Sequence, residues 1–357
     1  PGTLSSSLAL SIPVPLPMET PSPPLPLVCV TGGGGFIGSW LVRLLLSRGY
    51  AVHATVRDPG HPKNAFLMQL EGAPANLRLI KADMLDYDTV ATAFAGCEGV
   101  FHVATPVPER IVDPQKEMIE PAVKGTMNVL KASLAMKVHK LILVSSVGAC
   151  IFNPDWPQDM TKDESCWSNK EFCKENENWY SLAKTEAEEI ALDFGEKNGL
   201  HVNTICPALV IGPMLQHVAI NTTSKVLIYI IKGGPDMINN KFFPMVDVRD
   251  VAEALLLLYD KARPSERYLC SLDLVELNDL LGIMKPMFPT YSYADKIVDV
   301  DLNIAFTSDK LKNLGWKPRK LEETLMASVK SYEKAGLLHV SDGEPCRLPF
   351  LFRMPPA

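Results

Sequence analysis

Hydrophobic residues along the chain alternate between short apolar runs and longer stretches with helical spacing. The short runs, rich in branched aliphatic residues, predict strands at Leu27–Val30, Ala51–Val56, Leu77–Lys81, Gly99–Val103, Lys140–Ser145 and His201–Cys206. Between them, amphipathic stretches predict helices at Phe36–Arg48, Ile119–Met136 and Asn178–Lys197. Strands that alternate with helices are typical of a parallel sheet covered by helices on both faces. The sequence therefore predicts an α/β fold with a doubly wound parallel sheet.

The alternation breaks after the last of these strands into mixed loops and helices, and it resumes at Phe243–Tyr259 and Arg267–Cys270. This interruption indicates two parts of unequal size. We expect a Rossmann domain and a smaller C-terminal substrate lobe, each built from separate pieces of the chain. The Rossmann domain takes residues 27–206 and 243–270, and the substrate lobe takes residues 207–242 and 271–338.

The two ends of the chain differ in composition from the rest. Residues 1–26 are rich in Ser and Pro and contain no Arg, Lys or aromatic residue, so we expect this segment to be disordered. Translation that starts at Met18 is one interpretation of the segment. A transit peptide is another, although such peptides are usually rich in Arg. Residues 339–357 are expected to form a second loose tail.

Composition narrows the classes of function. The chain has 357 residues, 47% of them hydrophobic, and can bury a substantial core. Its net charge is −6 and it has no basic block, which argues against a nucleic-acid partner. No apolar run reaches the roughly 18 residues that a membrane span needs. The eight cysteines are scattered, without a CxxC pair, so we expect free thiols in a reducing cytoplasm and no metal site.

A glycine-rich segment, TGGGGFIG, connects the first predicted strand to the first predicted helix. Gly32, Gly35 and Gly38 are spaced three residues apart in it and match the pattern TGxxGxxG. One glycine of this pattern forms the bend, one lets the backbone approach a pyrophosphate, and one lets helix and strand pack closely. The helix start, at Phe36 and Ile37, attracts the anion. The flanking strand and helix favour a dinucleotide site over a flexible loop.

The residues after the second strand indicate which dinucleotide binds. Sites for NAD place an acidic residue about twenty positions after the turn, where it binds the ribose 2′-hydroxyl. Here Arg57 and Lys63 follow the strand, and two cations can pair with the 2′-phosphate of NADPH. Asp58 keeps open the alternative that both are solvated loop charges. We expect NADPH, with further contacts where the next two strands end, at Asp83, Met84, Val103, Ala104 and Thr105.

Tyr180 and Lys184 lie four residues apart and share one face of a predicted helix. A nearby ammonium lowers the pKa of a phenol from its usual value of about 10 and makes it a useful proton donor for a carbonyl. Ser145 and Ser146 end a buried strand, at the edge of a parallel sheet where ligands bind. We choose Ser146 over Ser145 as the hydroxyl that binds the carbonyl oxygen, because a small turn follows it. The ordered set of turn, serines and YxxxK predicts a reductase.

Four further segments resemble a known family. They are Phe101–Pro106 (FHVATP), Asp163–Trp167 (DESCW), Asn178–Tyr180 (NWY) and Cys206–Pro213 (CPALVIGP). Over residues 27–338 the chain resembles the plant extended short-chain dehydrogenase/reductases, which include cinnamoyl-CoA reductases, dihydroflavonol reductases and related aldehyde reductases. The resemblance implies a cytoplasmic NADPH-dependent enzyme, monomeric or weakly dimeric, that reduces small phenylpropanoid-type carbonyls. It also implies cofactor contacts at Pro207 and Val210.

The resemblance leaves the substrate open. Cinnamoyl-CoA reductases typically read NWYCYGK around the catalytic tyrosine, whereas this chain has Ser181, Leu182 and Ala183 in the three variable positions. The leading hypothesis is reduction of a hydroxycinnamoyl-CoA or an aromatic aldehyde. One alternative is a dihydroflavonol-type ketone reductase, and another is an NADPH-binding regulatory protein. The substrate lobe is expected to use Gln216, Asn221, Thr222 and Ile228.

The family resemblance also concerns two cysteines. Cys166 and Cys173 match a cysteine pair of the cinnamoyl-CoA reductases that can form a redox-sensitive bridge. Two free thiols are the alternative.

Overall fold

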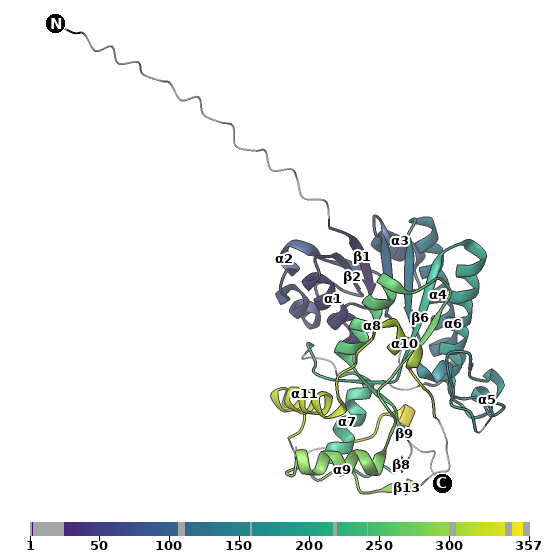
Figure 1. The fold of residues 1–357 in the computed structure, drawn as a ribbon, viewed down its shortest axis with the longest axis vertical. Coiled ribbons are helices and arrows are strands. Elements are labelled where there is room, and N and C mark those ends of the chain that lie inside the picture. The colour runs from purple at the N-terminus through teal and green to yellow at the C-terminus, as the bar shows by residue number, and fades with distance from the viewer. Residues whose placement is uncertain are drawn as a thin grey trace.

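We describe the fold from a computed structural model of the chain (Figure 1). The structure describes residues 2, 25–105, 111–157, 159–216, 220–240, 242–299, 305–339 and 345–352. The expectation that residues 1–26 are disordered therefore falls almost entirely outside the described residues. Among the described residues, no helix has the length and apolar character needed to cross a membrane.

Seven parallel strands form the central sheet, in the order β11-β6-β5-β4-β1-β2-β3. Their bounds are β1 Leu27–Thr31, β2 Ala51–Val56, β3 Leu77–Lys81, β4 Gly99–His102, β5 Lys140–Val144, β6 His201–Pro207 and β11 Arg267–Cys270. Strand order reverses between β1 and β4, because β2 and β3 follow on one side and β5 and β6 on the other. In such sheets ligands bind at the carboxyl ends of the strands beside this reversal.

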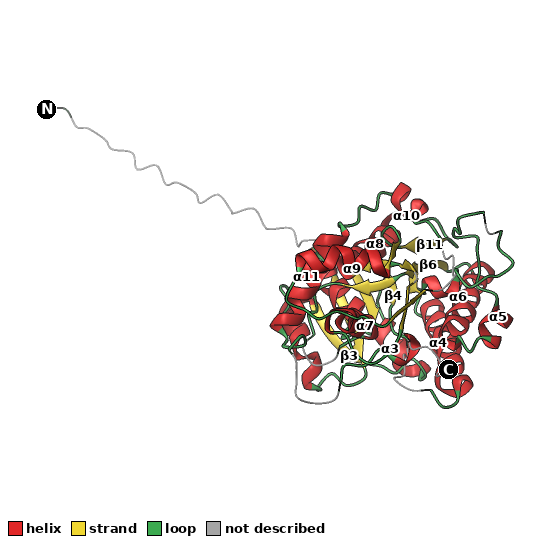
Figure 2. Ribbon diagram, turned by 90° about the horizontal axis from the view of Figure 1, so that it is seen from below, coloured by secondary structure: helices red, strands yellow, loops and turns green. Residues whose placement is uncertain are grey.

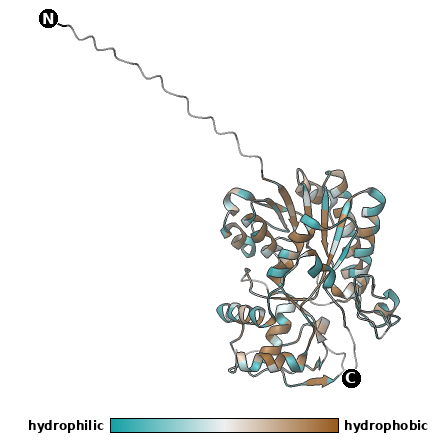
Figure 3. Ribbon diagram, in the orientation of Figure 1, coloured by the Kyte–Doolittle hydropathy of each residue, from teal (hydrophilic) through white to brown (hydrophobic). Residues whose placement is uncertain are grey.

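Helices cover both faces of the sheet, which Figure 2 shows as yellow strands between red helices. On one face lie α1 (Phe36–Ser47) and α8 (Val248–Lys261), which contact each other. On the other face lie α3 (Tyr87–Phe94), α4 (Glu120–Ala135) and α6 (Trp179–Asn198), with α4 packed between its two neighbours. Apolar side chains of the strands are buried between these layers, in agreement with the brown strands of Figure 3. The predicted doubly wound α/β fold is thus confirmed.

Several of the remaining strands and helices lie in the lower part of the molecule in Figure 1. The strands are β7 Leu209–Ile211, β8 Ile238–Asn240, β9 Phe242–Phe243, β10 Met245–Asp247, β12 Val275–Glu276 and β13 Ile297–Asp299, paired two by two. The helices are α7 Thr222–Lys232, α9 Leu277–Met287, α10 Asp309–Leu314 and α11 Leu321–Lys334. Shorter elements are η1 Pro62–Gln69, α2 Ala73–Asn76, η2 Gln115–Ile119, η3 Val147–Ala149, α5 Lys170–Glu175 and η4 Phe350–Phe352.

The C-terminal segment differs from the loose tail expected for residues 339–357. Residues 345–352 pack on the start of the loop after α7, where the Leu348 side chain is fully buried. The Leu348 N–H donates to Asp236 at 2.8 Å, and Arg347 forms an ion pair with the same carboxylate at 2.6 Å. An apolar side chain together with two polar contacts fixes this segment, and a Pro-rich composition gave no sign of either.

Candidate active site

The carboxyl edge between β1 and β4 is closed by hydrogen bonds centred on Thr31. Its hydroxyl oxygen accepts from the backbone N–H groups of Val103 and Ala104 at 3.0 and 3.1 Å. It also lies 2.9 Å from Nδ1 of His102. Burial, together with the charge of Lys184, lowers the pKa of His102 to about 3, so this imidazole is neutral at physiological pH. These bonds hold the two strand ends at the point where a ligand would lie.

The glycine turn has the geometry of a dinucleotide cradle. Gly32 has φ +68°, in the left-handed region that glycine tolerates, and a Cβ at Gly38 would lie 2.3 Å from the Gly32 carbonyl oxygen. Gly35 starts α1, and a Cβ there would meet only that carbonyl oxygen, at 3.2 Å. The first turn of α1 carries no acidic side chain. The space over Gly35 is therefore free of side chains and faces the positive end of a helix, which fits a pyrophosphate.

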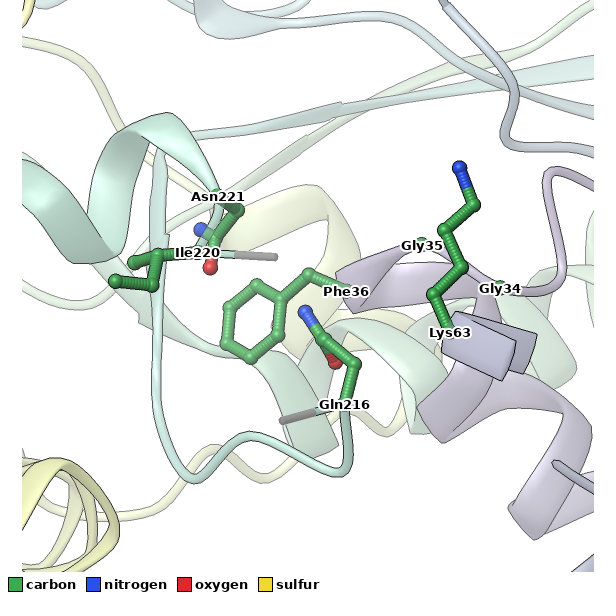
Figure 4. A pocket seen from close by; sticks show the side chains of 7 residues that line it. All are labelled: Gly34, Gly35, Phe36, Lys63, Gln216, Ile220 and Asn221. Carbon is green, nitrogen blue, oxygen red and sulfur yellow. The ribbon is translucent and has the colours of Figure 1, made fainter. Parts of the chain in front are cut away.

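A cavity of about 150 Å³ opens beside this turn (Figure 4). Its walls are Gly34, Gly35, Phe36 and Lys63 on the Rossmann side and Gln216, Ile220 and Asn221 on the other. The segment after β7 is held there at two points. The Trp40 indole N–H donates to the Pro213 carbonyl at 2.7 Å, and the Met214 N–H donates to Ser331 at 2.9 Å.

Gln216 and Asn221 each carry an amide oxygen without a hydrogen-bond partner in this cavity wall. Gln216 is only 5% exposed, yet its Oε1 makes no hydrogen bond with any described residue, and the same holds for the buried Oδ1 of Asn221. Buried polar atoms are nearly always paired, so an orphaned pair in a cavity indicates a missing polar ligand. The sequence places both residues in the expected substrate lobe, and the structure brings them to the glycine turn. Thr222 begins α7 beside them, whereas Ile228 is buried within that helix.

Arg57 directly follows β2, and Lys63 lies in η1. Arg57 is exposed and Lys63 half-buried, and within the described part of the chain neither forms an ion pair. Asp58 is engaged in its own turn, because its Oδ1 accepts the Gly60 N–H at 3.0 Å. Of the two cations, Lys63 lines the cavity beside the glycine turn.

The other predicted cofactor residues occupy strand ends along the same edge. Asp83 and Met84 follow β3, and one oxygen of Asp83 accepts the Leu85 N–H at 2.9 Å. Pro207 ends β6, and Val210 lies on β7, where its carbonyl accepts from the Thr223 hydroxyl. In the described part of the chain no group of three or more His, Cys, Asp or Glu side chains could hold a metal.

Tyr180 and Lys184 lie on successive turns of α6, whose first turn is capped by the Asn178 side chain. The Lys184 ammonium donates to the Thr105 hydroxyl at 2.8 Å and to the Val144 carbonyl at 3.0 Å. Lys184 is thereby fixed between the ends of β4 and β5, and it is 7% exposed. Burial lowers its pKa to about 8, against the opposing effects of Cys206 and Glu188.

The two serines at the end of β5 have different partners. The Ser145 hydroxyl donates to Glu188 Oε2 at 2.7 Å, inside the protein. The Ser146 hydroxyl accepts the Gly148 N–H at 3.1 Å and lies near Tyr180. Burial raises the pKa of Tyr180, and Ser146 opposes that rise. Ser146 is therefore the serine that the fold brings to Tyr180.

The residues that depart from the NWYCYGK pattern are buried in the protein. Ser181 and Leu182 are 2% and 6% exposed, and Leu182 packs with Met118, Ile119 and Cys173. Ser181 faces η3, because a Cβ at Gly148 would lie 2.8 Å from its Oγ. The substitutions thus alter how α6 packs on its neighbours. Cys166 and Cys173 are both buried free thiols in the structure.

Two residues at the site escaped sequence analysis, namely Glu188 and Arg267. Glu188 is fully buried on α6, and Arg267, from β11, donates to it at 2.8 Å. One signal was available: Tyr180, Lys184 and Glu188 follow at intervals of four, so all three share one helix face. The partner is 79 positions away in the sequence and gave no such signal.

Comparisons with known proteins place these features in context. The family model described as the NAD dependent epimerase/dehydratase family matches residues 28–270. The chain is 40% identical over 317 residues to cinnamoyl-CoA reductase 1 of Petunia hybrida, covering 88% of this chain and 94% of that protein. It is 37% identical over 329 residues to dihydroflavonol 4-reductase of Arabidopsis thaliana, covering 88% and 84%. The crystal structure of vestitone reductase from alfalfa (Medicago sativa L.) matches with a TM-score of 0.74 at 28% identity, covering 87% and 99%.

Proposed function

Because the chain belongs to the NAD dependent epimerase/dehydratase family, we propose that it is an NADPH-dependent reductase of phenylpropanoid-type carbonyls. Its relatives make it a nicotinamide-dependent oxidoreductase of the extended short-chain type. One observation carries the proposal further. Ser146, Tyr180 and Lys184 converge at the carboxyl edge of the sheet, beside the glycine turn.

Each of the three side chains has a distinct task in carbonyl reduction. The bound reduced nicotinamide supplies the hydride. Ser146 donates a hydrogen bond to the carbonyl oxygen and stabilises the negative charge that develops on it. Tyr180 gives its phenolic proton to the same oxygen. Lys184, held by Thr105 and Val144, stabilises the phenolate that remains and is placed to bind the ribose hydroxyls of the cofactor.

The choice of NADPH over NADH rests on Arg57 and Lys63. Both are cations without an ion-pair partner in the described part of the chain, and Lys63 lines the cavity beside the glycine turn. Asp58, the residue that would favour a free 2′-hydroxyl, accepts the Gly60 N–H with its Oδ1. A 2′-phosphate would give the two cations a shared anion.

Relatives guide the choice of substrate. The 40% identical petunia protein is a cinnamoyl-CoA reductase, which supports a hydroxycinnamoyl-CoA or an aromatic aldehyde as substrate. A dihydroflavonol-type ketone is the second candidate, supported by the 37% identical Arabidopsis reductase. The burial of Ser181 and Leu182 removes the main objection to a thioester, since these side chains pack inside the protein. We further expect a cytoplasmic enzyme that is monomeric or weakly dimeric.

Steady-state oxidation of NADPH with three carbonyl compounds tests the proposal. Feruloyl-CoA, coniferaldehyde and dihydroquercetin represent the thioester, the aldehyde and the ketone. Turnover with the first or second supports the proposal, and turnover with dihydroquercetin alone supports the second candidate. Tight NADPH binding without oxidation by any of a broad panel of carbonyls would replace both with an NADPH-binding regulatory protein.

A further inference from the structure

The end of β5 docks onto α6 at three consecutive positions. The Val144 carbonyl accepts from Lys184, the Ser145 hydroxyl donates to Glu188, and the Ser146 hydroxyl lies near Tyr180. Three successive turns of the helix are thus matched to three successive residues of the chain. Two of these contacts involve the side chains to which we assign the chemistry, and the middle one does not.

The middle contact belongs to a larger buried network around the Glu188 carboxylate. Glu188 is 0% exposed and receives four donors. Besides Ser145 at 2.7 Å, they are the Thr204 hydroxyl, the Cys206 thiol at 3.4 Å and the Arg267 guanidinium, whose Nε lies 2.8 Å away. A buried carboxylate needs such partners to remain charged.

Arg267 extends the network to the loop between η3 and α5. Its Nη1 donates to the carbonyls of Glu164 and Cys166 at 2.8 and 3.0 Å, and its Nη2 lies 3.0 Å from the Cys150 sulfur. The guanidinium also stacks on the Trp167 ring at 3.4 Å from the ring centre. The loop that follows Ser146 is therefore fastened to β11 through the same ion that pairs with Glu188.

We propose that Glu188 is a positioning residue for the reaction, one that sets Ser146 against Tyr180 through Ser145 and supplies the negative charge that keeps Lys184 protonated. This proposal rests on the proposed function. The Ser145 bond fixes the backbone on which Ser146 sits, and the Arg267 contacts fix the loop that follows. Without these contacts the hydroxyls of Ser146 and Tyr180 are no longer held in a fixed position relative to each other, although both side chains are still present.

The charged and titratable groups around Lys184 support the proposed effect of Glu188 on the protonation of Lys184. From β4, His102 faces Lys184 as a neutral imidazole, because its pKa is lowered to about 3. From β6, Cys206 faces it as a neutral thiol, because burial raises the pKa of that thiol well above its usual value. Tyr180, on the same helix, is neutral as well since its pKa is raised. Glu188 lies one helical turn from Lys184 in an ion pair with Arg267, and together with Cys206 it opposes the lowering of the Lys184 pKa by burial.

Two variants test separately the effect of the Glu188 charge on Lys184 and the positioning of Ser146. Glu188→Gln keeps the shape of the side chain and removes its charge, while Arg267 stays positive. We expect the alkaline limb of the kcat/KM profile to move to lower pH by about one unit, because an unpaired guanidinium also disfavours a second cation nearby. Ser145→Ala removes one hydroxyl and leaves Glu188 three donors. We expect a fall in kcat of about tenfold with the alkaline limb at its original pH and the dissociation constant for NADPH unchanged.

A matched control is Asp250→Asn. Asp250, on α8, is also fully buried and paired with an arginine, Arg319, and its carbonyl accepts from the Trp316 indole N–H. A role in folding alone predicts that Glu188→Gln and Asp250→Asn lose thermal stability alike and leave the limb in place.

The outcomes are decisive for each part. If the alkaline limb of Glu188→Gln stays at the wild-type pH, Glu188 does not keep Lys184 protonated. If Ser145→Ala has a normal kcat, Glu188 does not position Ser146 through Ser145. If Glu188→Gln does not fold, Ser145→Ala still decides the positioning. The pH profiles of kcat/KM are then compared between the wild-type protein and a Glu188→Asp variant. This variant keeps the negative charge, so its alkaline limb should stay at the wild-type pH, and a shifted limb would overturn the role of the charge. Failure of the proposed function would look different, because the wild-type protein itself would oxidise no NADPH.

Discussion

The two ends of the site are built in opposite ways. At the end that holds Tyr180 and Lys184, charged and hydroxyl groups are paired within the protein, from the Lys184 contacts to the four donors around Glu188. At the end beside the glycine turn, Gln216 and Asn221 keep orphaned amide oxygens, and Arg57 and Lys63 have no ion pair in the described residues. Groups that act on a reacting atom gain from being fixed beforehand, whereas groups that bind a phosphate can be completed by the ligand.

The largest effect is expected from Tyr180→Phe, which breaks the prearranged end at its proton donor. The phenyl ring fills the same space, so the fold and the affinity for NADPH should remain. We expect kcat to fall by about 10³-fold, within the usual range for loss of a general acid. Steady-state NADPH oxidation measures kcat, and fluorescence titration measures binding. Tyr87→Phe, at an exposed position on α3, is the control; comparable turnover in both variants would remove Tyr180 from its assigned role.

The second effect concerns the end of the site beside the glycine turn, where the cofactor is expected to bind. Arg57→Ala should raise KM for NADPH by about 10- to 100-fold, because a charge-assisted bond to the 2′-phosphate is lost. KM for NADH, which lacks that phosphate, should change little. Arg78→Ala, an exposed arginine on β3, provides the matched loss of charge. Equal increases for the two cofactors in Arg57→Ala would argue against a 2′-phosphate contact.

The third prediction uses pH to act on the prearranged end alone. Burial lowers the pKa of Lys184 to about 8, so the ammonium is present below that pH and is lost as the pH rises through it. Carbonyl reduction needs the ammonium beside the Tyr180 phenolate. Hence kcat/KM should fall about tenfold per pH unit above 8. Thermal unfolding followed over the same range shows whether the fold persists. A profile that stays flat to pH 10 would mean that Lys184 remains charged.

The smallest effect is expected at Gln216. Replacement by Leu removes an orphaned buried amide, so the free energy of unfolding without cofactor should stay the same or rise by about 1 kcal/mol. The affinity for NADPH should fall by about 3- to 10-fold, because the amide can no longer bind the ligand. Calorimetry and fluorescence titration measure the two quantities. A loss of stability without a loss of affinity would show that Gln216 serves the fold and not the ligand.

The sequence predicted most of the sheet because short runs rich in branched aliphatic residues are typical of strands. Ala51–Val56 and Leu77–Lys81 were predicted with the bounds that the structure gives them. The lower part was harder. Its strands have two or three residues and are fixed by partners distant in the sequence, as β9 is by β12. No short-range sequence pattern predicts the pairing of two such short strands.

The residues of the site show the same difference between local spacing, which the sequence reveals, and contacts between distant residues, which it does not. Tyr180 and Lys184 are four positions apart on one helix, so spacing alone brought them together. Glu188 continues that spacing, but a glutamate in a helix usually faces water. Its burial depends on donors from other strands, among them the distant Arg267. Gln216 was expected near substrate because of the lobe in which it lies. Its place beside the glycine turn depends on the bond from Trp40 to Pro213, which joins two distant parts of the chain.

The segment around Leu348 has a practical consequence for anyone who shortens or extends this protein. Its backbone lies so close to the chain after α7 that a Cβ at Gly234 would be 2.4 Å from the Cys346 carbonyl oxygen. A chain cut before residue 345 would therefore expose the apolar seat of Leu348 and leave Asp236 without the Arg347 guanidinium. Exposed apolar seats of this kind favour aggregation. A fusion partner or affinity tag at this end is best joined beyond residue 352, with Leu348 left in its seat.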